Sequence, residues 1–453
     1  MCYQRGLPEH STGSAATSMT HRQRILADRL LAVPAAFLFN GIARLLGAWL
    51  RRDHSIAPSN VNRIVVAKLI GMGSILQATP LLNALKRQYP RARVTFVTMR
   101  SNRELLNRLG CVDEVLVLDD RSLFKMAVTT IQTIATLVCY RADLYFDLEV
   151  YSAFASLLAL WAVTRIRIGF YRHSVAFKNG IYTHLVYFNT RMPVRQLYLQ
   201  LARVAGVPSD QPELTGPIRV DEGDRSGVMR ILSESPGWRP EEPYIVVNVN
   251  ASDLLLERRW PAEYFVDTLQ QFVFLGYQVA LIGNSNELPY VQRLFNRLSP
   301  DAQSRVTNTA GRLTLGELLA LLKDAACVLT NDTGPMHMAI ALQRPTVCLF
   351  GPAHPEHYGQ DLEYVDIFYS QVFCSPCLYE ADEPPCHGNN ICMQRIRTEP
   401  VIQAVMRFVD PDSYGKATQA NRWKTRVPMI ADAPNGTPLG VVVRASVKSI
   451  EGA

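Results

Sequence analysis

The stretch from residue 327 to residue 355 holds the densest group of residues that could do chemistry. An apolar run, 327–330, leads into the polar turn Asn-Asp-Thr-Gly at 331–334, and Pro335 then opens an apolar helical pattern. Proline suits the first turn of a helix, where its missing N–H is not needed. The order predicts a helix N-terminus beside a hydroxyl and a carboxylate. Free N–H groups and the helix dipole stabilise anions there, so we expect a phosphate or a ribose hydroxyl as ligand.

A second turn of interest is Gly71-Met-Gly73-Ser74, which joins the apolar run 63–68 to an apolar-periodic helical pattern at 75–87. Glycines at such a point let a backbone pass close to a ligand or adopt positive φ. The spacing is not G-x-G-x-x-G, so a nicotinamide-dinucleotide fingerprint is incomplete. A ligand-facing turn and a purely structural strand-to-helix turn both fit this pattern.

The second half of the chain supplies further polar groups at the ends of apolar runs. Asn250 follows the run 244–249, Gly283 ends the run 278–283, and the pair Arg258 and Arg259 precedes a helical pattern that opens at Pro261. Guanidinium groups bind phosphate oxygens in bidentate fashion and stay charged at any useful pH. The arginine pair therefore suits a diphosphate, and solvated surface charge is the alternative.

The elements that must position these residues form two series of alternating strands and helices. Strands are expected at 63–68, 93–98, 114–118, 142–147 and 166–169, and again at 244–249, 278–283, 326–330 and 346–350, with helical patterns between them. Such alternation predicts α/β domains with parallel, doubly wound sheets, whose ligands bind at the carboxyl ends of the strands. We expect an N-terminal domain at 61–215, a Pro- and Gly-containing linker at 216–242 and a second domain at 243–410.

The charge of the chain is concentrated at its two ends. The formal net charge of +7 comes entirely from 1–60 and 411–453, which leaves the middle neutral and argues against a nucleic-acid-binding core. Residues 1–25 have the composition of a disordered segment, and 411–453 that of a flexible tail in which 439–444 could pair as a strand. Scattered cysteines inside apolar runs and the lack of a cleavable signal pattern favour the cytoplasm.

An apolar stretch at 30–50 is followed by Arg51 and Arg52. Its longest uncharged piece, 30–43, is shorter than the roughly 20 residues that span a bilayer. Five of its apolar residues fall on one helical face: Leu38, Ile42, Leu45, Leu46 and Trp49. We interpret 30–52 as an amphipathic helix at a membrane surface, or as a helix that simply packs on the first domain.

Several of these motifs together resemble glycosyltransferase family 9, the lipopolysaccharide heptosyltransferase family. They are the motif from Thr330 to Ala339, Pro345, Phe350-Gly351-Pro352, Arg258 to Pro261, Lys68 to Pro80 and Tyr89-Pro90. The resemblance covers roughly residues 61 to 405. It implies two Rossmann-like, doubly wound domains that face a central cleft in the GT-B arrangement.

The resemblance also implies roles for named residues. Thr333, Gly334, Pro335 and His337 would bind the diphosphate and sugar of a nucleotide-sugar donor such as ADP-heptose. Asp332 would hydrogen-bond the sugar hydroxyls or orient the loop. Arg258 would meet the phosphates. Lys68, Gly71 and Gly73 would belong to the acceptor side. No divalent metal is expected, because arginine, the helix dipole and backbone N–H groups can carry the leaving group's charge.

One position departs from the family pattern. Where the family's heptosyltransferases have Gly-Asp, with the aspartate proposed as general base, this chain has Gly73-Ser74. A serine hydroxyl without an adjacent base cannot accept the acceptor's proton near neutral pH. Asp147 and Glu149, at the end of the strand 142–147, are candidate replacements, and we favour Glu149; a structural role for these acids explains them nearly as well.

Four cysteines cluster near the end of the second domain: Cys374, Cys377, Cys386 and Cys392. Their spacing is compatible with a closed structural zinc site, with reduced thiols in a loop near the donor, and with a disulfide. The chemistry of four cysteines does not decide between the three.

The sequence thus predicts an inverting, metal-independent glycosyltransferase at the cytoplasmic face of a bacterial inner membrane. The acceptor would be a lipopolysaccharide or another lipid-linked envelope glycan, and the inversion, the pathway and the bacterial setting are implied by the resemblance alone. Two alternatives remain open. Ser74 motivates a catalytically impaired sugar-nucleotide-binding or scaffold protein, and the same fold could also serve a nucleotide-sugar epimerase.

Overall fold

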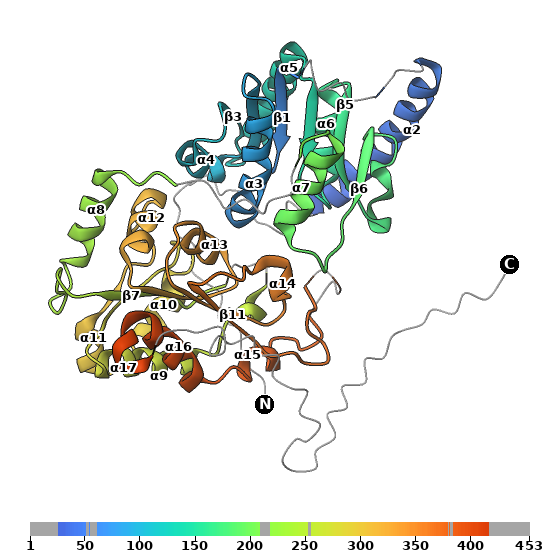
Figure 1. Cartoon of the computed structure of the whole chain (residues 1–453). Coiled ribbons are helices and arrows are strands. Elements are labelled where there is room, and N and C mark those ends of the chain that lie inside the picture. The colour runs from blue at the N-terminus through green and yellow to red at the C-terminus, as the bar shows by residue number, and fades with distance from the viewer. Residues whose placement is uncertain are drawn as a thin grey trace, which may run out of the picture.

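The protein folds into two α/β domains, each built on a parallel six-stranded sheet (Figure 1). The computed structural model describes residues 26–50, 54, 61–208, 218–251, 255–378, 380 and 384–415. The segment 1–25, Arg51 and Arg52, and nearly all of the predicted tail with its strand at 439–444 lie outside the described residues.

The first sheet has the strand order β3-β2-β1-β4-β5-β6, and all neighbouring strands are parallel. Its strands are β1 (Arg63–Ala67), β2 (Arg93–Met99), β3 (Glu114–Leu118), β4 (Leu144–Asp147), β5 (Ile166–Tyr171) and β6 (His184–Tyr187). The central strands are rich in valine, isoleucine and phenylalanine and are buried on both faces, as a parallel sheet between helices requires.

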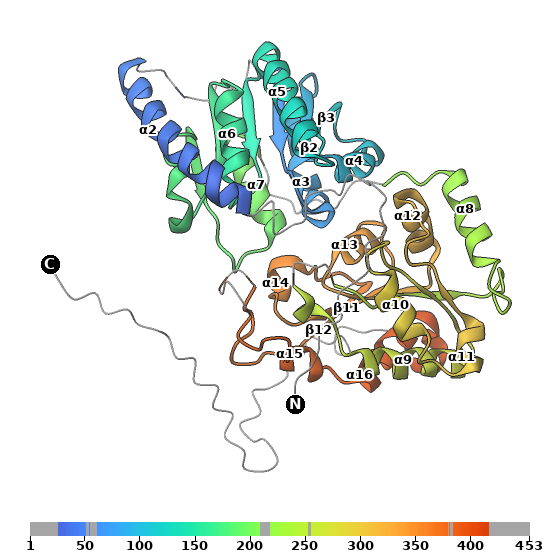
Figure 2. The same ribbon diagram turned by 180° about the vertical axis from the view of Figure 1, so that it is seen from behind.

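Helices cover both faces of this sheet. One face carries α3 (Met72–Gln88), α4 (Arg103–Leu109) and α7 (Val194–Val204), and the other carries α5 (Leu123–Tyr140), α6 (Ala153–Trp161) and the N-terminal helix α2 (Val33–Leu50) (Figures 1 and 2). Short helical turns precede α2 and fill the β5–β6 connection: η1 (Asp28–Ala32) and η4 (His173–Lys178).

The second sheet repeats the plan with the order β12-β11-β10-β7-β8-β9, again all parallel. Its strands are β7 (Tyr244–Asn248), β8 (Gln278–Leu281), β9 (Val306–Asn308), β10 (Cys327–Asn331), β11 (Thr346–Phe350) and β12 (Val365–Tyr369). One face packs against α12 (Leu315–Asp324) and α13 (Gly334–Ala341). The other packs against α9 (Ala262–Phe274), α10 (Leu288–Phe295), α11 (Pro300–Arg305) and α16 (Thr398–Val409).

The predicted linker contains a helix that packs on the second domain. This helix, α8 (Glu222–Leu232), lies beside α12 and is joined to α4 of the first domain by Arg108, whose guanidinium donates to Asp224 at 2.6 Å. The domain boundaries themselves stay predictions. Short elements complete the second domain: η5 (Leu256–Arg258), α14 (Pro355–Tyr358), α15 (Ile391–Gln394) and α17 (Pro411–Tyr414).

The predicted N-terminal helix is present, and it contacts the first domain with one face only. Ala32 and Ala36 are buried, and Phe37 and Phe39 make edge-to-face contacts with Phe177 and Trp161. The five apolar residues that the sequence places on one face are all exposed: Leu38, Ile42, Leu45, Leu46 and Trp49. The helix therefore packs on the domain and also presents an apolar surface outward.

Candidate functional site

The two turns singled out by the sequence lie against each other, although they belong to different domains. Gly71 has φ of +97° and ends the connection from β1, so that α3 begins at Met72. A Cβ atom built on Gly73 would lie 2.4 Å from Cδ2 of His337, in the first half of α13. Glycine at position 73 is thus required by the close approach of α3 to α13.

Gln77, to which the sequence motifs assign no role, makes a polar contact between the same two helices. Its side-chain nitrogen donates to the carbonyl of Tyr358 at 3.0 Å and lies 3.3 Å from Nδ1 of His337. A carbonyl can only accept, so the amide nitrogen faces Tyr358, and its second hydrogen is directed to His337. Nδ1 is then the acceptor, and in the neutral ring the proton is on Nε2. A buried polar residue inside an apolar-periodic helix was the signal that could have found Gln77.

His337 is held in this neutral form by its surroundings. Burial, and secondarily the charge of Arg258, lower the pKa of His337 to about 4. At neutral pH the ring therefore offers a hydrogen-bond donor at Nε2 and carries no charge.

The predicted anion site at the start of α13 has no side-chain cap. Thr333 occupies the cap position, but its hydroxyl accepts from Asn248 at 2.8 Å and donates to the carbonyl of Asn331 at 3.2 Å. Gly334 is open, since a Cβ atom there would meet nothing within 4 Å, and Pro335 follows in the first turn. The first N–H groups of α13 are thus left for a ligand.

The two arginines of the predicted pair separate. Arg258 donates from Nη1 to the carbonyl of Asp332 at 2.9 Å and lies 3.7 Å from its carboxylate. Burial raises the pKa of Asp332, and Arg258 opposes that shift. The guanidinium of Arg259 instead stacks on the ring of Tyr290, 4.1 Å from its centroid. Only Arg258 is beside the start of α13.

Asn250 lies at the carboxyl end of β7 and is almost fully buried. Neither its side-chain nitrogen nor its side-chain oxygen has a hydrogen-bond partner. Its amide nitrogen lies 3.1 Å from the position that a Cβ atom would take on Gly283. An unpaired buried amide costs about 1–3 kcal/mol, which a ligand with a donor and an acceptor would recover.

The two acids predicted as replacement bases are both engaged in structural contacts. Glu149 accepts through Oε1 from the backbone N–H groups of Leu69 and Ile70 at 2.8 and 3.1 Å, and Oε2 lies 2.8 Å from Nζ of Lys68. Burial alone would raise the pKa of Glu149, but Lys68 and the two N–H groups outweigh it and lower the pKa. Glu149 therefore holds Lys68 and the backbone just before the Gly71–Ser74 turn in place.

Asp147, two residues before Glu149, is fully buried. Its carboxylate accepts from the hydroxyl of Tyr182, from the backbone N–H of Glu149 at 2.9 Å and from Nζ of Lys178 at 3.2 Å. Burial raises the pKa of Asp147 despite Lys178. Lys178 also donates to the carbonyl of Glu149 at 2.5 Å, so this network supports the Glu149 contact from behind. Ser74 is half-buried at the start of α3.

The cysteine loop lies beside the Arg258 segment and the loop that follows β11. The backbone N–H of Cys377 donates to the carbonyl of Pro352 at 3.0 Å, and Asn390 donates to the carbonyls of Glu257 and Arg259 at 2.9 and 2.7 Å. All four cysteines are free thiols. Burial raises the pKa of Cys377 to about 11 and that of Cys392 to about 12. Among the described residues, no three potential ligand side chains are grouped to hold a metal ion.

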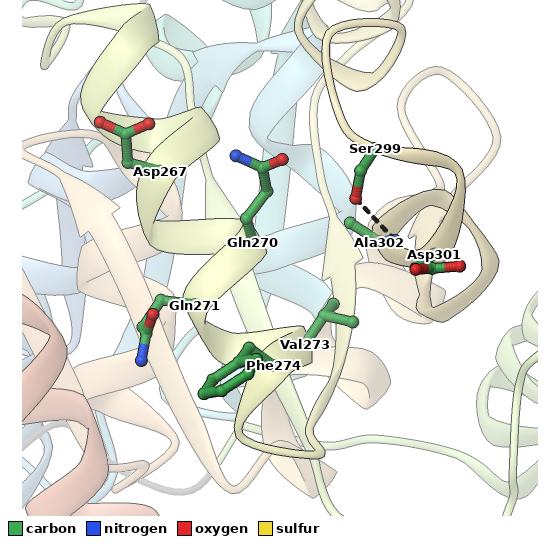
Figure 3. Close-up of a pocket in the computed structure, with 8 residues that line it drawn as sticks. All are labelled: Asp267, Gln270, Gln271, Val273, Phe274, Ser299, Asp301 and Ala302. Carbon is green, nitrogen blue, oxygen red and sulfur yellow. Dashed lines mark hydrogen bonds between the residues drawn. The ribbon is translucent and has the colours of Figure 1, made fainter.

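A separate hollow of about 430 Å³ lies far from these turns, at the end of α9 and the start of α11 (Figure 3). It is lined by Asp267, Gln270, Gln271, Val273, Phe274, Ser299, Asp301 and Ala302. It contains none of the residues that the sequence predicts for the site.

Comparison with known proteins identifies the family. The model of glycosyltransferase family 9 (heptosyltransferase) matches residues 135–387, which is more than half of the chain. The chain belongs to glycosyltransferase family 9. The family named from the sequence motifs is therefore confirmed.

This family 9 chain has relatives among lipopolysaccharide heptosyltransferases. It is 32% identical over 146 residues to lipopolysaccharide heptosyltransferase 2 of Escherichia coli (strain K12), an alignment that covers 32% of this chain and 40% of that protein. The chain thus spans about two fifths of the length of the curated relatives that it matches at this level of identity.

Two solved structures confirm the fold. The glycosyl transferase family 9 protein from Veillonella parvula DSM 2008 superposes with a TM-score of 0.65 at 22% identity, over 78% of this chain and 99% of that one. The E. coli ADP-heptose lipopolysaccharide heptosyltransferase II gives 0.63 at 22% identity, over 77% and 98%. The predicted architecture of two Rossmann-like domains in the GT-B arrangement is confirmed.

Proposed function

We propose that this protein transfers a heptose-like sugar from a nucleotide-sugar donor, ADP-heptose or a close relative, to a lipopolysaccharide or other envelope glycan. The transfer inverts the sugar's anomeric centre and requires no metal ion. Family membership and the relatives' names support the donor and acceptor classes.

One observation carries the proposal: the acceptor-side turn and the donor-side helix start touch, through Gly73 and His337. A group transfer needs the two substrates held within reach of one another, and this contact places the carboxyl ends of β1 and β10 together. Holding reactants in such an arrangement can lower a barrier by several kcal/mol.

The donor side would stabilise the leaving nucleoside diphosphate. Arg258 and the uncapped N–H groups of α13 supply positive charge where negative charge develops, and the Nε2–H of His337 supplies a neutral donor beside them. Such preorganised donors are worth about 10²–10³-fold each in rate. The unpaired amide of Asn250 would bind another polar edge of the donor.

The acceptor side lacks an evident base. We predicted Glu149 or Asp147 for this role, and their contacts favour a positioning role for both, because every oxygen of the two carboxylates already has a partner. A positioned general base contributes about 10²–10⁴-fold. Transfer by this chain would therefore be slow relative to a family member that has aspartate at the position of Ser74.

The lack of an evident base on the acceptor side favours a second candidate function, a catalytically impaired sugar-nucleotide-binding protein. In that case the donor half would keep its affinity and the acceptor half would no longer support turnover. No observation in the described residues favours the epimerase alternative over these two.

The loops at the acceptor edge support an anionic acceptor at a membrane. Arg100 and Arg103 follow β2, Arg172 follows β5 and Arg191 follows β6. These cations suit the phosphate or carboxylate groups of a glycan. The outward apolar face of α2 is consistent with a protein at the cytoplasmic surface of the inner membrane.

Release of ADP from ADP-heptose, measured in EDTA with and without a lipopolysaccharide core acceptor, tests the proposal. We expect acceptor-dependent release by the wild type, and about 10²-fold faster release by Ser74→Asp, which supplies the missing carboxylate. Ser304→Asp, which adds the same charge on α11 of the second domain, is the matched control and should match the wild type.

The binding-protein function would be established instead by two results together. The acceptor would not increase the rate of ADP release by either the wild type or Ser74→Asp, and the protein would still bind ADP. A requirement for a divalent metal would contradict the metal-independent mechanism.

A further inference from the structure

The outer face of the first domain is unusually apolar, and it is built from two helices far apart in the sequence. On α2, Leu45 and Trp49 are 75% and 79% exposed. On α5, Phe124 and Ile131 are 78% and 67% exposed, and with Val138 they recur every seven residues on one stripe. Both helices lie on the side of the first sheet that Figure 2 brings to the front, with α6 between them.

An apolar hollow of about 690 Å³ lies between α5 and α6 and extends this face. Trp161 lines it, and the same ring is in edge-to-face contact with Phe39 of α2 at 5.8 Å. The exposed side chains of α2 and α5 therefore belong to one surface. The hollow is lined by Leu123, Met126, Ala127, Thr130, Ile131, Ile134, Phe154, Leu160, Trp161 and Val163.

The few charges of the two helical segments are arranged for an anionic partner. Residues 26–50 and 123–140 contain four charged side chains. The three basic ones, Arg29, Arg44 and Lys125, are exposed. The one acidic side chain, Asp28, is turned toward the domain, where it accepts from the backbone N–H groups of Ala153 and Phe154 at 3.0 and 2.8 Å. Within these two segments, the charged side chains that are exposed are therefore all basic.

This surface begins beside the acceptor edge of the sheet. The N–H groups that Asp28 caps open α6, directly after the β4 connection that contains Glu149 and Tyr151. A lipid-linked acceptor that leaves a bilayer under α2 and α5 would therefore reach the Gly71–Ser74 turn along the same edge.

Both helices are long and apolar enough to cross a membrane by length and composition. Their packing argues against crossing. Thr133 and Leu137 of α5 are buried in the domain, α5 contacts β3, and α2 contacts α6 and η4. Because both helices are packed against the first domain, they can contact a bilayer only with their outer sides.

We propose that α2 and α5 form one docking face that lies in the plane of an anionic lipid surface, with the α5–α6 hollow taking up acyl chain or glycerol-backbone groups. The inference deepens the proposed function, on which it rests for the lipid-linked nature of the acceptor. The new element is α5: the membrane contact requires a helix of the catalytic domain itself as well as the N-terminal helix.

Sedimentation of the full-length protein with vesicles tests this proposal. Vesicles of phosphatidylcholine alone are compared with vesicles that also contain phosphatidylglycerol. We expect binding to the anionic vesicles, weakened by added salt, and about tenfold weaker binding for the double variant Phe124→Ser/Ile131→Ser, which leaves α2 intact. Both side chains are exposed, so the variant should fold, and its melting temperature checks this.

Phe274→Ser is the matched control. Phe274 is 82% exposed but belongs to the distant hollow at α9 (Figure 3), so its removal should leave vesicle binding unchanged. Stabilisation of the double variant by ADP should equal that of the wild type, which separates membrane docking from donor binding.

Three results would overturn the proposal. One is full vesicle binding by the double variant, which would leave α2 as the sole contact. Another is equal binding to neutral and anionic vesicles, which would remove the role of the cations. The third is a wild-type dimer that Phe124→Ser/Ile131→Ser dissociates and that binds no vesicles, which would make the face an interface between two copies. Failure of sugar transfer with vesicle binding intact would count against the proposed function alone.

Discussion

The turn after β1 and the turn after β10 each follow a central strand of a parallel six-stranded sheet, yet their polar groups are used differently. After β10, the N–H groups at the start of α13 lack a side-chain cap, and the amide of Asn250 nearby has no partner. After β1, the N–H groups of Leu69 and Ile70 are satisfied by Glu149, which is also paired with Lys68.

The difference lies in the residues around the two helix starts, since neither α3 nor α13 has a side-chain cap. Beside α13, Arg258 and the unpaired amide of Asn250 are suited to a ligand, whereas the segment before α3 is held in place by Glu149 and Lys68. Family members that carry aspartate where this chain has Ser74 would add a reactive group to the acceptor-side half. In this chain we therefore expect donor binding to be separable from catalysis, and four experiments test that expectation.

Removal of Arg258 should have the largest effect. Arg258→Ala should lower kcat/KM for the nucleotide sugar by about 10²–10³-fold, because it removes the charge beside the start of α13. Arg258→Lys should recover part of the loss. Arg259→Ala is the matched control, since that guanidinium stacks on Tyr290, and it should cost less than about tenfold. Equal losses for the two alanine variants would show that both arginines bind the donor.

Gly73→Ala should break the contact between the two halves. The new Cβ atom would lie 2.4 Å from Cδ2 of His337, so the imidazole ring or the two helices must shift. We expect about a hundredfold loss of transfer, since small misplacements at a reacting centre are costly, with ADP binding retained in a thermal-shift measurement. Gly223→Ala in α8, where a Cβ atom meets nothing within 4 Å, is the control. Wild-type rates for Gly73→Ala would contradict the required contact.

Glu149→Gln should act mainly on stability. It removes the charge that pairs with the buried Lys68, so the free energy of unfolding in urea should fall by about 3–5 kcal/mol. The rate of the remaining folded enzyme should fall by less than about tenfold. A loss of 10³-fold or more at unchanged stability would instead restore Glu149 as the general base.

His337 should make the protein acid-sensitive. Its pKa is lowered to about 4 in the folded state, so the unfolded chain binds more protons as pH falls below about 6.5. Stability is therefore lost between about pH 6.5 and pH 4, by about 3 kcal/mol, and regained as pH rises. Urea unfolding of the wild type and of His337→Asn across this pH range tests the predicted loss of stability. The free energy of unfolding should depend less on pH in the variant. An identical pH dependence in both proteins would contradict the lowered pKa of His337.

Much of the fold could be predicted from the sequence because central strands of a parallel sheet are continuous apolar runs. The bounds of β3 and β11 match the expected ranges, and β10 differs by one residue at each end. The edge strands β6, β9 and β12 were missed. The first two are only four and three residues long, and such short runs carry little pattern. The run Val365–Tyr369 did carry a β-branched and aromatic signal.

The site was predictable where its chemistry is local and unpredictable where it depends on distant partners. The start of α13 follows from the order of residues 331 to 335 alone. The role of Glu149 does not, because its partners Leu69 and Ile70 lie 80 and 79 residues earlier in the chain. For the same reason the sequence could not show that Arg258 and Arg259 diverge, nor that Gln77 meets His337.

Calorimetric titration of ADP-heptose into the metal-free protein tests the central claim most directly, namely that the start of α13 with Arg258 binds the donor independently of the acceptor-side turn. We predict binding with a Kd in the range of ordinary substrate KM values, about 1 μM–1 mM, at least about tenfold weaker in Arg258→Ala and unchanged in Ser74→Ala. Absence of binding by the wild type, or equal affinity in Arg258→Ala, would contradict it.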